Sequence, residues 1–274
     1  MVTCTVCLIA KNEGPYLLEW IAYYRNIGFD KVVVYENNSS DSSASLLKAL
    51  ARSGQIIHRP WKLGAKESPQ ITAYVDAIGK ADTDWIFFVD CDEFLVLHNT
   101  TLKNMLAPIH ARSNVTAIGI NWRIFGSSHR SKWEPGLVIE RFTRAAAADF
   151  PMNDHLKSFL RIGTIGPHID MHMSDTNGQI VFADGEELTL LSRGRSNKIR
   201  LDCAQINHYY TKTYEEYLVK AKRGQAGTGE NSDLKYWYND DSFKLHDVND
   251  VEDLSALNYL DDTQLEIKRL RNFL

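Results

Sequence analysis

The first half of the chain alternates uncharged apolar runs with amphipathic stretches. Apolar runs predict strands at 2–10, 31–35, 55–58 and 85–89, of which the first is expected to be buried. Apolar residues at helical spacing predict helices between them, over 15–27, from the cap residue Asp41 to Gly54, and over 68–81. Repeated strand–helix units require right-handed crossovers, so the pattern predicts an α/β fold with a mostly parallel central sheet flanked by helices.

The second half of the chain is less regular. Apolar runs predict strands at 116–122, 137–142 and 156–161, and helical spacing predicts helices over 213–223 and 261–274. Neither an internal repeat nor a low-complexity linker divides the 274 residues. We therefore predict one compact domain with an extended C-terminal part.

Polar segments follow three of the predicted strands in the first half. They occupy positions 11–13, 36–41 and 90–93. Ligands of open parallel sheets bind at the carboxyl ends of the strands. We therefore expect these segments, although far apart in sequence, to meet at one edge of the sheet.

The acidic cluster Asp90-Cys91-Asp92-Glu93 directly follows the uncharged run at 85–89. Three carboxylates this close repel one another, and burying them unpaired is unfavourable. A divalent cation would resolve the repulsion, and carboxylate oxygens suit Mg²⁺ or Mn²⁺, which can also bridge a diphosphate. The alternative is an acidic turn exposed to water, because isolated Asp-x-Asp pairs are common.

Composition and charge narrow the class of protein. The formal net charge of −4 does not favour a nucleic-acid binder. Cys4 and Cys7 fall within the first strand, where they would point to opposite faces as buried thiols, which fits a reducing compartment.

The N-terminal residues lack a signal-peptide pattern, and no run approaches about 20 apolar residues. We expect a cytoplasmic protein with no transmembrane segment, and peripheral contact with the inner face of the membrane is compatible with this.

Several motifs carry a family resemblance. The run Lys-Asn-Glu-Gly-Pro-Tyr-Leu-Leu-Glu-Trp at 11–20, Tyr23-Tyr24, Gly28 and the run Val-Tyr-Glu-Asn-Asn-Ser-Ser-Asp at 34–41 resemble the start of family 2-like glycosyltransferases, especially the branch close to family 92 (the DUF23 type). Further matches follow in order up to about residue 225: Gln70, 73–74, Asp76, 85–95, 121–122, 125–128, 140–142, 157–161, 207–209, Glu215, Lys220 and 223–224. Each piece is weak alone, and their number and order make the combination specific.

The resemblance implies a GT-A fold. It implies a Rossmann-like nucleotide-sugar half at 1–97 and an acceptor half at 98–225, followed by a C-terminal helical extension at 226–274. It implies that Asp90 and Asp92 hold Mn²⁺ or Mg²⁺ and touch the donor, with His208 as a third ligand. The other positions that it implies for the donor are Lys11, Asn12, Glu13, Asn37, Asp41, Gln70 and Asp76. By spacing alone, His208 is more often a cap or packing residue than a ligand, and the segment at 37–41 also suits a tight turn.

Three residues are candidates for the base that deprotonates an acceptor hydroxyl. Asp170 comes first because it lies between the segment at 157–161 and His208, and Asp154 and Glu134 are alternatives. His168, Asp170 and His172 alternate along the chain. If that stretch is extended, all three share one face, which is either solvated or lines a site.

Four further residues are candidates for binding the substrates. Lys157 and Arg161 could neutralise a diphosphate, since a guanidinium binds phosphate oxygens through a planar fork, or they could form a surface strand face. Trp122 and Trp133 could stack on an acceptor sugar, although aromatic residues of this kind often belong to the core.

The sequence therefore predicts a metal-dependent glycosyltransferase of the hexosyltransferase class. It would move a sugar from a nucleoside diphosphate sugar, with a UDP-sugar favoured, to a hydroxyl of a saccharide or lipid-linked acceptor, as in polysaccharide biosynthesis. Inversion at the anomeric carbon is implied by the resemblance. The alternatives are a nucleotidyltransferase or sugar-nucleotide pyrophosphorylase, which the lack of a Gly-rich phosphate loop disfavours, and a non-catalytic carbohydrate-binding protein.

Overall fold

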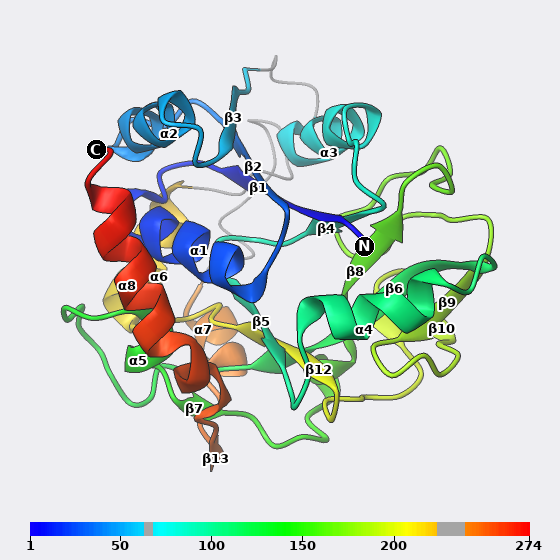
Figure 1. Cartoon of the computed structure of the whole chain (residues 1–274). Helices are drawn as coiled ribbons and strands as arrows, with labels where there is room; N and C mark the ends of the chain where they lie inside the picture. The colour runs from blue at the N-terminus through cyan, green and yellow to red at the C-terminus, as the bar shows by residue number, and fades with distance from the viewer. Residues whose placement is uncertain (63–67, 224–238) are drawn as a thin grey trace.

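A central sheet organises the protein, whose computed structural model describes residues 1–62, 68–223 and 239–274. Its strand order is β3-β2-β1-β4-β8-β6-β12-β5, and β9 pairs with β6 as well (Figure 1). The strands are β1 (Cys4–Ala10), β2 (Lys31–Glu36), β3 (Ile57–Pro60), β4 (Trp85–Phe88), β5 (Glu93–Leu97), β6 (Val115–Ile124), β8 (Leu156–Arg161), β9 (Gln179–Phe182) and β12 (Ala204–His208). Two short ribbons lie outside the sheet: β7 (Arg144–Ala145) with β13 (Val251–Glu252), and β10 (Leu190–Ser192) with β11 (Arg195–Ser196).

Helices cover both faces of this sheet. They are α1 (Gly14–Ile27), α2 (Ser43–Arg52), α3 (Pro69–Gly79), α4 (Leu102–His110), α5 (Val138–Arg141), α6 (Tyr214–Arg223), α7 (Asp240–His246) and α8 (Leu260–Arg271), with 3-10 turns at Pro151–Asp154 and Ser255–Tyr259. The first helix shows how the sequence sets its ends: Pro15 occupies the first turn, and Gly28 closes it at φ 101°. In the described residues no helix is long and apolar enough to cross a bilayer.

The direction of the strands follows the predicted pattern. β1 pairs in parallel with β2 and β4, and β2 pairs in parallel with β3. β8 runs antiparallel between β4 and β6, and β5 runs antiparallel to β12 at the edge of the sheet. The predicted α/β fold with a mostly parallel central sheet flanked by helices is therefore confirmed.

Alternate residues of β1 enter different cores, as a strand requires. Cys4, Val6 and Leu8 join the larger core beneath α1, α2, α4 and α8, whereas Cys7 and Ile9 join a smaller core beneath α3. The two cysteines are buried free thiols on opposite faces, as predicted.

One predicted strand is wrong. The segment at 137–142 forms the short helix α5, because the buried Glu19 carboxylate accepts hydrogen bonds from the first backbone N–H groups of that helix, Val138 at 2.8 Å and Ile139 at 3.2 Å. This cap comes from α1, about 120 residues earlier, so a local apolar pattern could not reveal it.

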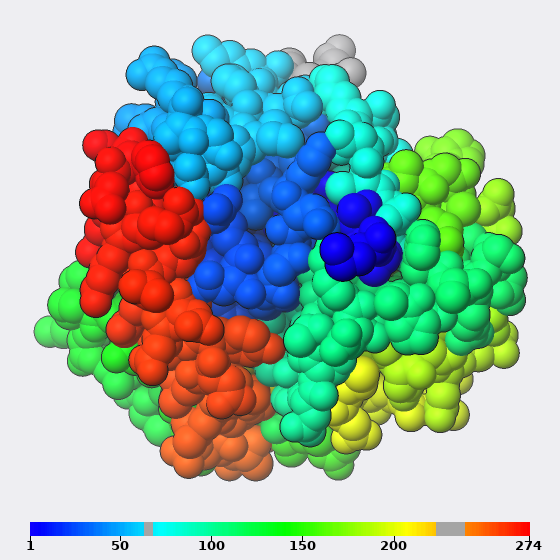
Figure 2. All heavy atoms as spheres, viewed as in Figure 1, coloured from blue at the N-terminus to red at the C-terminus, as the bar shows by residue number. Residues whose placement is uncertain are grey.

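The C-terminal helix packs against the first helix. α8 lies beside α1 in Figure 1, and the red C-terminal surface borders the blue N-terminal surface in Figure 2. Arg25 on α1 donates to Glu266 on α8 at 2.6 Å, and Ile267 and Leu270 enter the larger core. Of the predicted extension at 226–274, residues 226–238 lie outside the described part, and the remainder packs onto the main body of the protein.

Glu19 makes stability depend on pH. Burial raises the pKa of Glu19 to about 7, against hydrogen bonds from Val138 and Ile139 that lower it. A carboxyl group whose pKa is higher in the folded than in the unfolded state keeps its proton longer when folded, so stability falls as pH rises between about 4.5 and 7. We expect this group to lower the free energy of unfolding by at most about 3 kcal/mol between pH 5 and pH 8.

The Glu19→Gln variant should have a shallower decline, measured by urea unfolding at several pH values. Glu252→Gln, at an exposed glutamate, is the control and should keep the wild-type slope. An unchanged slope in Glu19→Gln would contradict the assignment.

Candidate functional site

The loops after β1 and β2 are joined by hydrogen bonds at one edge of the sheet. Asn12 is in the left-handed region at φ 52°, its N–H donates to Ser39 Oγ at 3.0 Å, and its Oδ1 accepts from the Ser40 N–H at 2.7 Å. Asp41 accepts from the Gly14 N–H at 2.9 Å and, with its other oxygen, from the Ser43 N–H at 2.9 Å. The backbone N–H of Asn37 donates to Ala10 O at 2.8 Å. The segments at 11–13 and 36–41 therefore meet as expected.

The acidic cluster forms the tight turn between β4 and β5. Asp90 follows β4, and Glu93 begins β5 and accepts a hydrogen bond from the Asp90 N–H at 2.7 Å. On α3, Gln70 donates to Asp90 Oδ1 at 3.0 Å. On β8, Lys157 donates to Asp90 Oδ2 at 2.9 Å and lies 3.2 Å from Glu93 Oε2. One lysine from an antiparallel neighbouring strand therefore contacts two of the three acids.

Burial affects the charges of Glu93 and Lys157 differently. Burial raises the pKa of Glu93 to about 8, although the nearby Lys157 opposes the shift. Burial also disfavours the charge on Lys157, but Asp90 and Glu93 outweigh it and raise the pKa of this lysine, which stays charged. Glu93 Oε1 is buried without a hydrogen-bond partner. Glu93 is therefore a supporting neighbour of the turn, and Asp90 is the acid that presents part of its side chain to solvent.

Asp92 faces a separate group of basic side chains. Lys220 on α6 donates to Asp92 Oδ2, and His208 Nε2 lies 3.9 Å from the same oxygen. Burial opposes ionisation, but Lys220, Lys212 and His208 hold the pKa of Asp92 well below its ordinary value. His208 ends β12 and pairs with Glu93 across the sheet, so strand register brings it to the turn.

The pair Asp92 and His208 fits part of a divalent metal site. Burial lowers the pKa of His208 well below its ordinary value, and the neutral imidazole is the form that binds metals. In the part of the chain that the structure describes, no group of three His, Cys, Asp or Glu side chains is arranged around one ion position. Mg²⁺ commonly takes only one or two protein ligands and completes its shell with phosphate and water. Asp90, the other predicted ligand, has one oxygen bonded to Gln70 and the other to Lys157.

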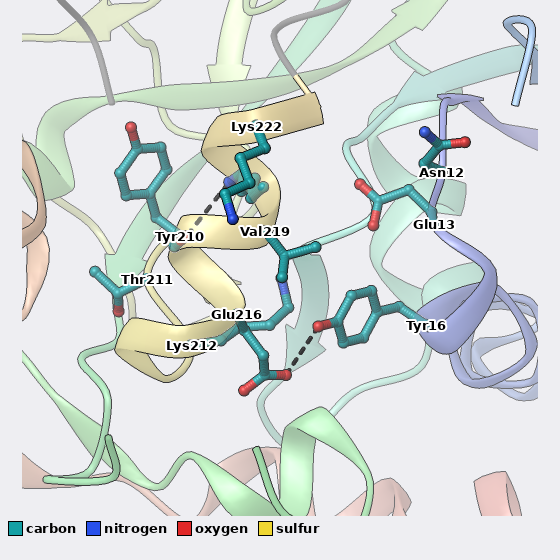
Figure 3. Close-up of a pocket in the computed structure, with 10 residues that line it drawn as sticks. Asn12, Glu13, Tyr16, Tyr210, Thr211, Lys212, Glu216, Val219 and Lys222 are labelled. Atoms are coloured by element: carbon teal, nitrogen blue, oxygen red, sulfur yellow. Dashed lines mark hydrogen bonds between the residues drawn. The ribbon is translucent and has the colours of Figure 1, made fainter. Parts of the chain in front are cut away.

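A pocket of about 260 Å³ opens between the start of α1 and α6. The lining residues are Asn12, Glu13, Tyr16, Tyr210, Thr211, Lys212, Glu216, Val219, Lys220 and Lys222 (Figure 3). Tyr16 from α1 donates to Glu216 on α6 at 2.9 Å, the dashed bond between the two sides of the pocket in Figure 3. Arg141 holds the same carboxylate through two hydrogen bonds, at 2.8 and 2.9 Å. Because Arg141 neutralises Glu216, the lysines dominate the charge of the pocket.

The predicted diphosphate role of Lys157 and Arg161 is corrected. Arg161 ends β8 and pairs with Trp85, at the end of β4 opposite to the acidic turn. Its guanidinium donates to the carbonyl oxygens of Val115 at 2.7 Å and His110 at 3.0 Å, and it lies 4.7 Å from the centre of the Trp85 ring. Lys157 is fully buried, and its ammonium contacts Asp90, Glu93 and the Met171 carbonyl. With three contacts for three donors, it has none left for a ligand.

The two tryptophans have different surroundings. Trp122 is 8% exposed, its ring stacks on His155 with centroids 4.9 Å apart, and the His208 ring lies 4.2 Å away. These histidines cover the ring, so the structure does not support stacking of Trp122 on a sugar. Trp133 is 51% exposed, and its backbone N–H donates to Glu215 on α6 at 2.8 Å. Trp133 remains a candidate for acceptor contact.

The three candidate bases have different hydrogen-bond and ion-pair partners. Asp154 is held by Arg195 through bonds of 2.6 and 3.0 Å, and Glu134 forms an ion pair with Arg130 on the surface. The segment around Asp170 is an irregular loop, so the extended arrangement considered for His168, Asp170 and His172 is not formed. His168 is exposed, whereas Asp170 Oδ1 accepts from the His172 N–H at 2.8 Å, within a loop whose Met171 carbonyl contacts Lys157.

Asp76 does not join the acidic turn. Its carboxylate accepts from Tyr35 Oη at 2.7 Å and forms an ion pair with Lys80 on the same helix. Gln70, one and a half turns earlier on α3, does reach Asp90. Of the two residues predicted beside the donor on α3, the structure therefore brings only Gln70 to the cluster.

Sequence reasoning missed part of the pocket. Tyr16, Lys212 and Glu216 line the pocket but are not among the predicted site residues. Lys220 is predicted only as one of the positions that match the family. Lys212 sits in the run Tyr-Tyr-Thr-Lys-Thr, which has no motif, and no signal in the sequence shows that it is buried beside Asp92. The polar run after the apolar strand ending at His208 is the only local sign of a strand-end loop.

Comparisons with known proteins define the class as glycosyltransferases. The model of glycosyltransferase family 92 matches residues 1–147, more than half of the 274 residues, and the chain therefore belongs to that family. The resemblance drawn from the motifs is confirmed.

Curated relatives from plants share this family. A family 92 protein of Oryza sativa subsp. japonica is 27% identical over 168 residues, which cover 60% of this chain and 28% of the relative. One from Ricinus communis is 30% identical over 130 residues, which cover 45% of this chain and 23% of the relative. The chain thus spans about a quarter of the length of these relatives.

Solved structures show only a distant likeness. TarS from S. aureus is 15% identical at a TM-score of 0.37, covering 59% of this chain and 28% of that one. The mannosyltransferase PcManGT from Pyrobaculum calidifontis, in complex with GDP-Man and Mn²⁺, is 19% identical at a TM-score of 0.36, covering 44% of this chain and 35% of that one. At these TM-scores we carry no residue role from either protein to this chain.

Proposed function

We propose that this chain transfers a sugar from a nucleoside diphosphate sugar to a hydroxyl group, with inversion at the anomeric carbon and with a divalent metal ion. One observation carries the proposal: the Asp90–Asp92 turn lies at the strand ends beside a lysine-lined pocket, within a glycosyltransferase family. Such a turn offers carboxylates for a metal, and the pocket offers positive charge for phosphate.

Asp92 and His208 would hold the metal ion, Mn²⁺ or Mg²⁺. When bound, it would stabilise negative charge on the leaving diphosphate. Gln70 and Lys157 fix Asp90 in one orientation, which suits a side chain that contacts the donor sugar. Lys11, Asn12, Glu13 and Asn37 lie on the strand-end loops beside the turn and would hold the nucleoside.

Asp170 is the proposed base. Its loop contacts Lys157 through Met171, whereas Asp154 and Glu134 are each engaged by an arginine. One Asp170 oxygen is bonded to backbone N–H groups, which orients the carboxylate so that the other can accept the proton of the acceptor hydroxyl. The acceptor is a saccharide or a lipid-linked sugar, and Trp133 is the exposed aromatic residue available to contact it.

Nucleotide binding tests this proposal. Calorimetric titration with UDP and with GDP should show binding in the presence of Mn²⁺ and strong weakening after its removal with EDTA, with UDP the favoured base. Absence of any metal-dependent binding of a nucleoside diphosphate would contradict the proposal. Tighter binding of UTP or GTP than of the diphosphates would favour nucleotidyl transfer instead.

A further inference from the structure

Lys212 is an unusual lysine at the base of the pocket. It lies in the loop between β12 and α6 with φ 49°, a left-handed conformation that a residue other than glycine seldom adopts. Its side chain lines the pocket although the residue is only 5% exposed. Its Nζ lies 4.6 Å from the centre of the Tyr16 ring. Across residues 1–62, 68–223 and 239–274, no hydrogen-bond acceptor contacts this ammonium group.

Burying an ammonium group without hydrogen bonds is unfavourable. Asp92 and Glu13 attract the charge from a distance, yet burial lowers the pKa of Lys212. Lys157, which is fully buried, is different because it contacts two carboxylates and a carbonyl. Lys212 is therefore a mostly buried cation that lines the cavity, and within the described residues no protein acceptor takes its hydrogen bonds.

The charges around Lys212 favour an anion in this cavity. Lys220 and Lys222 line the same pocket, and Lys220 is also paired with Asp92. Of the two glutamates in the lining, Glu216 is neutralised by Arg141. A phosphate group could accept hydrogen bonds from Lys212, and the strong acceptors of a diphosphate match the unused donors.

We propose that Lys212 binds the diphosphate of the donor, as the phosphate subsite of the pocket between α1 and α6. This proposal rests on the proposed sugar transfer for the identity of the ligand. The ammonium group of Lys212 supplies the diphosphate contact that was predicted for Lys157 and Arg161. Those two residues use their hydrogen-bond donors within the protein. Tyr16 covers the ammonium group on one side and leaves the cavity side for phosphate oxygens.

Substituting Lys212 tests the subsite. Lys212→Met keeps the length of the side chain and removes the charge, and Lys212→Arg restores the charge. Lys268→Met, at an exposed lysine on α8, is the matched control. Each protein is titrated by calorimetry with UDP, GDP and inorganic pyrophosphate in the presence of Mg²⁺, and its melting temperature is recorded without ligand.

We expect Lys212→Met to bind the preferred diphosphate at least about 10-fold more weakly, because charge-assisted hydrogen bonds are lost. Lys268→Met should bind like the wild type, and Lys212→Arg should recover part of the affinity. Without ligand, Lys212→Met should melt at or above the wild-type temperature, since an unfavourable buried charge is gone. Unchanged diphosphate affinity, or a lower melting temperature that indicates a purely structural role, would overturn the proposal.

The pyrophosphate arm separates this proposal from the proposed function. If the wild type binds pyrophosphate through Lys212 but no nucleotide, the phosphate subsite stands and the nucleotide-sugar donor is wrong. If the wild type and Lys212→Met bind UDP or GDP equally, the donor stands and the subsite is wrong. If the wild type binds none of the three probes, both proposals fall.

Discussion

Replacing Asp92 by asparagine is expected to lower the rate of sugar release from the donor by about two to three orders of magnitude. The substitution keeps the shape of the side chain and removes its charge. The carboxylate is buried, contacts Lys220 and lies 3.9 Å from His208 Nε2. An amide in this position would hold a divalent cation more weakly, because its neutral oxygen lacks the negative charge with which the carboxylate attracts the ion.

A surface aspartate supplies the control for Asp92. Asp82→Asn removes an exposed carboxylate that forms an ion pair with Lys31. Asp82 precedes β4, whereas the acidic turn follows that strand, so the rate should stay unchanged. Thermal melting of both variants separates loss of activity from loss of folding. A wild-type rate in a folded Asp92→Asn protein would remove Asp92 from the mechanism.

Replacing Lys157 by methionine should produce the largest loss of stability, about 3–5 kcal/mol in the free energy of unfolding. The methionine fits the volume, but Asp90 and Glu93 lose their shared cation, and Glu93 is fully buried. In the wild type, burial raises the pKa of Glu93 and the charge of Lys157 lowers it. Removing Lys157 therefore raises this pKa further. Because the folded wild type also keeps this proton up to about pH 8, the defect relative to the wild type should grow as pH rises above about 8.

Urea unfolding at pH 5, pH 8 and about pH 9.5 measures this effect. Lys31→Met, which removes an exposed ion pair, should change stability by less than about 1 kcal/mol at each pH. If Lys157→Met is as stable as the wild type at pH 8, then the buried ion pairs of the turn contribute little.

The first half of the fold could be predicted because its signals are local. β1 and β4 are uncharged runs, β2 has an apolar centre, and the resulting parallel order brings Asn12 and Asp90 to one edge of the sheet. The acidic turn could be predicted for the same reason, since strand ends gather in parallel sheets. The strand at 156–161 also matched its boundaries.

The parts that could not be predicted depend on partners distant in sequence. The helix at α5 is capped by Glu19, and Arg161 is occupied by carbonyl groups of α4 and β6. His208 reaches the turn because β12 pairs with β5, a strand that the short run after the cluster did not reveal. Lys212 has no local pattern at all, because its burial arises only when α6 folds against Tyr16.

Sugar release from nucleotide sugars is the measurement that tests sugar transfer at this site most directly. UDP- and GDP-linked hexoses are screened with the wild type and with Asp92→Asn, each with Mn²⁺ and with EDTA. The proposed function predicts that the wild type hydrolyses at least one donor, that EDTA abolishes the reaction, and that Asp92→Asn loses it. Equal hydrolysis by the wild type and Asp92→Asn, or no consumption of any nucleotide sugar by the wild type, would contradict it.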